Sequence, residues 1–129
     1  MKIEIKSVNE VRYPTIGDFY KKDEKDIIEV LDTNKEIYNR IVAIHELIEQ
    51  TCTEYMGISE EEITKFDLDN LDSDEPGELP NSPYKEYHLL AEIVERMICN
   101  SLNIDFNEYN EHLAKVFDNA NNSSESRSK

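Results

Sequence analysis

Apolar and charged residues alternate along residues 1–8. A period of two is the pattern of a half-buried β-strand. Two further apolar segments, 18–20 and 26–31, are separated by a polar turn at 21–25. We therefore predict a small N-terminal antiparallel sheet or long hairpin, with an apolar face that other elements must cover.

The pattern then changes to the spacings of three and four that are typical of amphipathic helices. The first such stripe predicts a helix from about 34 to 55, capped by Thr33 or Asn34, and it consists of Ile37, Ile41, Ile44, Ile48, Cys52 and Tyr55. The second predicts a helix from about 83 to 102, and it consists of Tyr87, Leu90, Ala91, Val94, Met97 and Ile98. Shorter helices are expected after Ser59 and after Asp105, which are good N-terminal capping residues.

These elements predict an α+β fold, in which a small N-terminal sheet packs on two main helices with one or two short helices beside them. A chain of 129 residues is long enough for one hydrophobic core. We expect a single domain over residues 1–118. Residues 119–129 are rich in Asn and Ser, and their composition predicts a disordered polar tail.

The charge of the chain limits the classes of function that it can have. There are 29 Asp and Glu residues against 14 Lys and Arg, a formal net charge of −15. Such a chain repels phosphate backbones and anionic membrane surfaces, so we expect neither direct nucleic-acid binding nor membrane binding. An acidic surface suits metal ions or a basic partner protein, although solubility alone is also a sufficient reason for it.

Cysteine usage and hydropathy indicate the compartment. Cys52 and Cys99 both fall in apolar helical segments, without a paired framework or a Cys-x-x-Cys motif. The chain has no secretory signal pattern and no apolar run near the ~20 residues that span a bilayer. We therefore expect two reduced core cysteines in a cytoplasmic protein.

The segment His45-Glu46-Leu47-Ile48-Glu49 could carry chemistry. On a helix, His45 and Glu49 lie one turn apart on the same side, with Glu46 rotated by about 100°. In zinc hydrolases a His-Glu-x-x-His segment supplies two ligands at this spacing, and its Glu is the general base. Here Glu49 replaces the second His, and carboxylates are also zinc ligands. We expect His45 and Glu49 to bind metal and Glu46 to be the catalytic base.

The second main helix carries another pair of this kind. His88 and Glu92 are four residues apart, and Glu95 competes with Glu92 for the same position. If the two helices pack together, the pairs give two His and two carboxylates, a set that suits zinc best, or manganese or iron. The predicted metal ligands are therefore His45, Glu49, His88 and Glu92. The alternative is that both His are ordinary packed residues and the Glu side chains are solvated.

The segment between the main helices, residues 67–83, is acidic and lacks helical periodicity. It does not match a calcium-binding loop, because Leu71 stands where a ligand is needed and no Glu completes the pattern. A long loop of this kind is a candidate lid. From it, Asp67 or Glu75 would reach into the His/Glu cleft.

Several of these segments together resemble a family of small phage- or prophage-encoded proteins of unassigned function. The resemblance covers about residues 1–113, and it is carried by residues 41–49, Gly57-Ile58-Ser59, Glu75-Pro76-Gly77-Glu78, and Pro83-Tyr84 through His88 and Glu95. The order of strands before His-Glu, with a later acidic helix, is also similar to minimal gluzincin-like metallopeptidases. That similarity implies His45 and Glu49 as ligands, Glu46 as base, and His88 or Glu92 as third ligand.

Three classes of function remain open. The first is a degenerate zincin-like, metal-dependent hydrolase encoded by a phage. The second is a non-enzymatic binding protein that inhibits or modulates a host protein through its acidic surface. The third is a nucleotide-handling enzyme that uses carboxylate-bound magnesium, against which the two His and the N-terminal strands argue.

Overall fold

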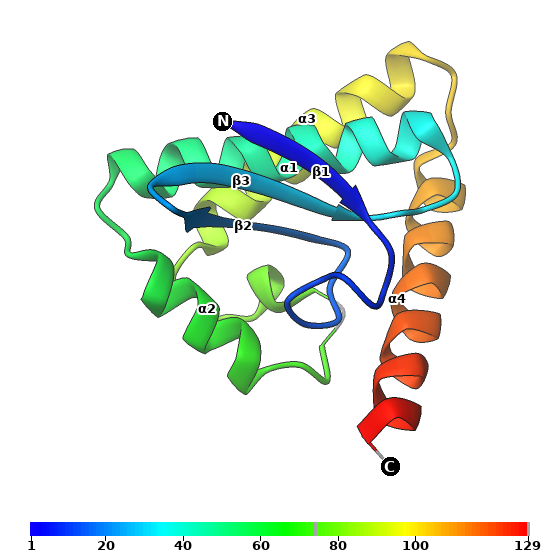
Figure 1. The fold of residues 1–129 in the computed structure, drawn as a ribbon. Coiled ribbons are helices and arrows are strands. Elements are labelled where there is room, and N and C mark those ends of the chain that lie inside the picture. The colour runs from blue at the N-terminus through cyan, green and yellow to red at the C-terminus, as the bar shows by residue number, and fades with distance from the viewer. Residues whose placement is uncertain (74, 129) are drawn as a thin grey trace.

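The computed structural model describes residues 1–73 and 75–128, and it has an α+β fold (Figure 1). An N-terminal sheet is followed by helices, in the order β1 (Lys2–Lys6), β2 (Gly17–Lys22), β3 (Lys25–Leu31), α1 (Glu36–Tyr55), α2 (Glu60–Asp69), the short 3-10 helix η1 (Pro76–Glu78), α3 (Lys85–Ser101) and α4 (Phe106–Ser128). The predicted fold class is therefore confirmed.

The sheet has the strand order β1-β3-β2. β2 and β3 form the expected antiparallel hairpin, whose turn at Asp23 and Glu24 has positive φ angles. β1, however, pairs with β3 in parallel, so the sheet is mixed and not wholly antiparallel. The connection from β1 to β2 is too long for a tight turn, and β3 occupies the gap between them. Its Ile28 and Val30 are completely buried, as suits a central strand.

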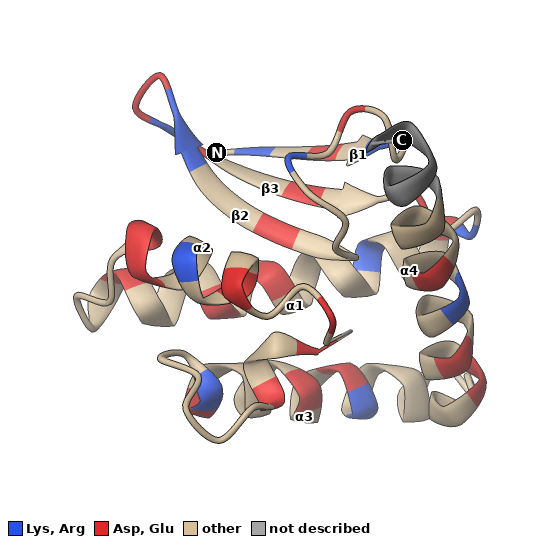
Figure 2. Ribbon diagram, turned by 90° about the horizontal axis from the view of Figure 1, so that it is seen from below, with Lys and Arg blue, Asp and Glu red and all other residues tan. Residues whose placement is uncertain are grey.

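Helix α1 lies between the sheet and α3 (Figure 2), with contacts to β2 and β3 on one side and to α3 on the other. The sequence predicted that both main helices would cover the sheet, whereas α3 instead packs on α1. The expected cap also differs. Helix α1 begins after Lys35 without a side-chain cap, because Asn34 is in the left-handed region at φ 66°.

The buried face of α1 is not the predicted apolar stripe. Ile37, Ile44 and Tyr55 are 40%, 38% and 89% exposed. Ile41 is the fully buried member of that stripe, and the other buried residues lie outside it, among them Tyr38, Val42, Ala43, Glu46, Glu49 and Thr53. Because α1 has neighbours on two sides, its buried surface is wider than one stripe and includes polar side chains. In α3 likewise, the polar residues His88 and Glu95 are buried while apolar residues of its predicted stripe face solvent.

Helix α4 packs against the first turns of α1, where the rings of Tyr38 and Tyr109 meet edge to face at 5.0 Å. It continues past the domain boundary predicted at residue 118. Ala120 is buried, and the helix is described as far as Ser128. The apolar spacing that includes Leu113 and Phe117 extends to Ala120, which explains why the helix does not give way to a tail at 119.

Acidic residues occur on all four α-helices (Figure 2). Cys52 and Cys99 are both free, as predicted, but only Cys99 is fully buried in the core, whereas Cys52 is half-buried. None of the helices in the described residues is long and apolar enough to cross a bilayer.

Candidate metal centre

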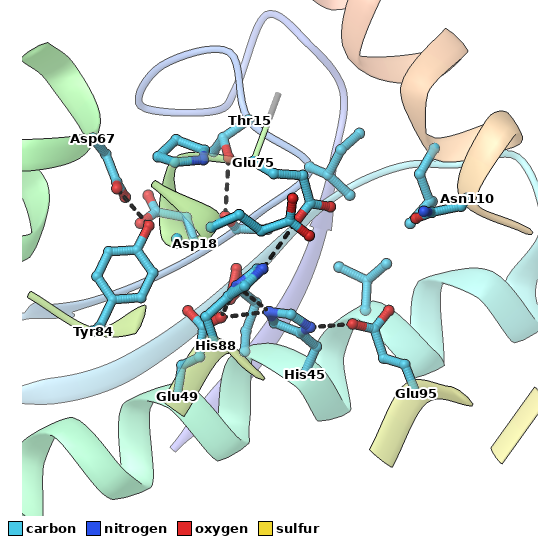
Figure 3. Close-up of a pocket in the computed structure, with 18 of the residues that line it drawn as sticks. Thr15, Asp18, His45, Glu49, Asp67, Glu75, Tyr84, His88, Glu95 and Asn110 are labelled. Atoms are coloured by element: carbon cyan, nitrogen blue, oxygen red, sulfur yellow. Dashed lines mark hydrogen bonds and ion pairs between the residues drawn. The ribbon is translucent and has the colours of Figure 1, made fainter. Parts of the chain in front are cut away.

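His45 and Glu49 of α1 meet His88 of α3 where the two helices pack together (Figure 3). Nε2 of His45 lies 3.2 Å from Nδ1 of His88. Both nitrogens contact the same oxygen of Glu49, Oε2, and the His88 contact measures 2.7 Å. Three donor atoms from two helices therefore converge on one point.

The outer nitrogen of each imidazole is held by a second carboxylate. Nδ1 of His45 contacts Oε1 of Glu95, and the other oxygen of Glu95 accepts a hydrogen bond from the Tyr109 hydroxyl. Nε2 of His88 lies 2.9 Å from Oε2 of Glu75. Histidine ligands of metals are usually oriented in this way, because the carboxylate fixes both the tautomer and the direction of the ring.

The segment around η1 covers the His88 ring. A Cβ atom at Gly77 would lie 2.6 Å from Cγ and Nδ1 of His88, so only glycine fits at this position without a shift. The Tyr84 ring also stands edge-on to the imidazole. The predicted lid therefore does reach the cleft, with Glu75 in contact with His88.

Burial and charge act in opposite directions on the cluster. Burial opposes ionisation of Glu49, but the neighbouring His45 and His88 outweigh it and lower its pKa to about 2. Burial also opposes protonation of His88, but Glu49 and Glu75 raise its pKa to about 10. The pKa of His45 is raised well above its usual value by Glu49 and Glu95. Without a metal, the carboxylates thus hold positive charge on the imidazoles.

Glu46 projects into the same cavity but has no partner there. It is 7% exposed, and its Oε2 atom is buried without a hydrogen bond. Burial, and then the charge of Glu49, raise the pKa of Glu46 well above its usual value. Gly17 packs against this carboxylate, since a Cβ there would lie 2.5 Å from Oε1. A buried carboxyl oxygen without a partner is costly, and that of Glu46 belongs to a residue lining a cavity where a ligand can reach it.

The cluster forms one wall of a cavity of about 490 Å³ between β2, α1, α3 and α4. Asp67 of α2 also lines this cavity, and it accepts hydrogen bonds from Tyr84 at 2.6 Å and Tyr13 at 3.2 Å. Burial raises the pKa of Asp67 to about 6. Asn107, Asn110 and Glu111 of α4 complete the lining, and Asn110 is labelled in Figure 3.

One predicted ligand lies outside the cluster. Glu92 does not line the cavity and instead pairs with Arg96 at 3.2 Å on the surface of α3. Glu95 takes the inward position. On a helix, residues seven apart differ by about 20° in direction and residues four apart by about 40°, so Glu95 lies closer than Glu92 to the line of His88. His45, Glu46, Glu49 and His88 are brought together as expected.

The donor set fits a divalent metal ion. Zinc binds imidazole nitrogens at about 2.0–2.1 Å in a tetrahedral arrangement, which places two ligand atoms about 3.3 Å apart. The 3.2 Å between the two His nitrogens matches this separation, whereas the Glu49 oxygen lies at hydrogen-bond distance from both, 2.7 Å from Nδ1 of His88, and would move outward to bind the same ion. Together with the Glu49 oxygen they form a group of potential ligands, all within 4.8 Å of one another. Two His and one carboxylate leave a position open, as catalytic zinc sites do.

Sequence reasoning missed Tyr109, Gly17 and Gly77. The chain has only three Gly residues, and two of them pack against site residues. Their scarcity is a signal that could have found them, because glycine is retained where a backbone must approach closely. Comparison of the chain with protein-family models, curated proteins and solved structures gave no match.

Proposed function

We propose that this chain is a zinc-binding domain that acts as a metal-dependent hydrolase of the zincin-like type. One observation carries the proposal. Two His nitrogens from different helices point at a single Glu49 oxygen, while the outer nitrogen of each ring is fixed by another carboxylate. Three ligand-type atoms oriented in this way are the arrangement of a metal site, and bound metal is what distinguishes it from a carboxylate that bridges two protonated imidazoles.

Each residue has a separate role in this proposal. His45, Glu49 and His88 hold the ion, and Glu95 and Glu75 position the two rings. The ion would supply Lewis-acid polarisation of a carbonyl group and of water. Glu46 is the general base that accepts the proton of the attacking water. A divalent ion close to Glu46 favours its ionised form, which a base needs.

The first test is the metal content of protein purified without a histidine tag, measured by plasma mass spectrometry. We expect near-stoichiometric zinc in the wild type and its loss in His45→Ala and in His88→Ala. His112→Ala is the matched control, because His112 lies on α4 and contacts the Thr33 carbonyl instead of the cluster. Metal-free wild type that cannot be loaded with zinc, manganese or iron would refute the proposal.

The catalytic part needs a second variant. Glu46→Gln keeps the shape of the side chain and removes its function as a base. We expect this variant to retain zinc and to lose hydrolysis of amide or ester substrates that the wild type cleaves in a screen. Hydrolysis that is unchanged in Glu46→Gln would exclude Glu46 as the base.

Membership of the phage-type family and a cytoplasmic location belong to the same proposal. A second candidate function is a non-enzymatic protein that binds a basic host protein. It is favoured by exposed apolar side chains on an acidic chain, among them Leu89, Ile93 and Met97 of α3. This function predicts a complex with the basic partner whose affinity falls as salt rises. Glu46→Gln should leave that affinity unchanged, and Ile93→Ser should lower it.

A further inference from the structure

The charged side chains that line the cavity are almost all acidic. Within the described residues, no Lys or Arg contributes to the lining, while eight carboxylates do: Asp18, Glu46, Glu49, Asp67, Glu75, Glu78, Glu95 and Glu111. The two His are the sole basic groups in this wall. The cavity is therefore more acidic than the surface as a whole.

Part of this charge is compensated within the protein. Arg12 reaches Asp18 from outside the cavity with two hydrogen bonds of 2.9 and 3.0 Å. The imidazoles of the cluster hold Glu49, Glu75 and Glu95, as described above. A divalent ion would replace the imidazole protons, but acidic groups would still outnumber cations.

Glu46 is the independent sign that a ligand completes the cavity. Its side chain is more than nine-tenths buried, faces the cavity, and has an oxygen without a hydrogen-bond partner. Glu111, in contrast, is exposed at the α4 rim. Carboxyl groups thus line the cavity from its floor to its entrance.

Such a lining selects against anions. A phosphate or carboxylate would enter against several like charges in a partly desolvated space, which disfavours nucleotides and acidic peptides. An ammonium or guanidinium group would be attracted to the same charges, and the amides of Asn107 and Asn110 offer neutral hydrogen-bonding groups beside them.

We propose that the substrate of this site is an amide that carries a cationic side chain, of the Lys or Arg type, next to the bond that is cleaved. The inference rests on the metal-dependent hydrolase proposed above, because it takes the ion as the place where the amide carbonyl binds. The acidic walls then hold the side chain.

Three hydroxamate probes distinguish the effect of side-chain charge on binding from the effect of side-chain shape. A hydroxamate chelates an active-site metal in place of an amide, and acetylation removes the α-amino charge. The probes are Nα-acetyl-lysine hydroxamate, its norleucine analogue of similar length without charge, and its glutamate analogue. Affinity for the zinc-loaded protein is measured by calorimetry at low and high salt, with zinc content measured separately.

We expect the lysine probe to bind at least tenfold more tightly than the norleucine probe, with the glutamate probe weakest and the differences smaller at high salt. Equal affinities, or a preference for norleucine or glutamate, with zinc bound would overturn the inference and leave the metal site standing. A protein that binds no zinc would overturn both.

A charge at the rim gives a test that does not disturb the cluster. Glu111→Gln removes one carboxylate from the cavity entrance, and Glu108→Gln makes the same change on the same helix outside the lining. We expect about threefold weaker binding of the lysine probe in Glu111→Gln, the size of one partly screened charge. Glu108→Gln should bind as the wild type does. Identical affinities in the two variants would contradict the placement of the cation near α4.

Discussion

Gly77→Ala should weaken metal binding without removing a ligand. The added Cβ would lie 2.6 Å from Cγ and Nδ1 of His88 and 2.8 Å from the Tyr84 ring. Ordinary contact begins at 3.4 Å, so the imidazole must retreat by about 0.8 Å. Metal sites tolerate deviations of about 0.2 Å in ligand distance. The required shift is several times larger than this tolerance. The contacts of the ring with Glu75 and Glu49 also oppose such a movement.

We expect zinc affinity to fall by about 10- to 100-fold, the range found when groups that orient a metal ligand are changed. Overpacking should also lower the free energy of unfolding by about 1–3 kcal/mol. Zinc affinity is measured by competition with a chromophoric chelator under conditions where the protein is folded, and stability by urea unfolding of the metal-free protein.

Gly57→Ala is the matched control. Gly57 has a φ of 74°, and a Cβ there would have nothing within 4 Å. The substitution should cost about 1 kcal/mol of stability through backbone strain alone and leave zinc affinity unchanged. If Gly77→Ala binds zinc as tightly as Gly57→Ala does, the packing of η1 on His88 does not position this ligand, and the reasoning is wrong.

Three further predictions concern pH, ligand positioning and metal linkage. Burial raises the pKa of Asp67 to about 6 in the folded protein, so the folded state binds this proton more tightly than the unfolded state does, and the protein loses stability as pH rises from about 4 to 6. Urea unfolding should therefore show that Asp67→Asn gains stability relative to wild type across this pH range. A stability difference that does not change with pH would contradict the prediction. Tyr109→Phe removes the hydroxyl that Glu95 accepts from and should lower zinc affinity up to about tenfold in chelator competition, while Tyr55→Phe at an exposed position should have no effect. Zinc at 100 times its dissociation constant should stabilise the wild type by about 2.7 kcal/mol and raise its Tm by about 10 °C in calorimetry, with no rise in the metal-ligand variants; an equal rise in those variants would place the ion elsewhere.

Periodicity predicted the elements well because it depends on local sequence. The strand segments, the two predicted main helices and the acidic connection between them lie close to where the residue pattern placed them, whereas the last helix, expected to be short, has 23 residues as α4. The parallel pairing of β1 with β3 could not be predicted in this way, since it depends on how the chain crosses between strands. Both arrangements place the same apolar residues in strands.

The sequence pattern was least successful in predicting which face of each helix is buried. On α1 the stripe through Ile37 and Ile44 is the more apolar face, yet Glu46 and Glu49 are buried and those two Ile are partly exposed. The sheet and α3 pack on two sides of α1, so polar side chains at the α3 interface are buried as well, and the residue pattern alone does not reveal this. The same uncertainty in rotation explains why Glu92 was favoured over Glu95.

The location of the cluster on α1 also has an evolutionary consequence. This helix supplies His45, Glu46 and Glu49, and it is at the same time the element on which both the sheet and α3 pack. Drift in its sequence would therefore alter fold and chemistry together. The cavity walls formed by Asn107, Asn110 and Glu111 of α4 and by residues 75–78 lie outside the hydrophobic core, to which other side chains of α4, such as Tyr109, belong. Descendants of such a protein could acquire new specificities through those walls while α1 stays almost unchanged.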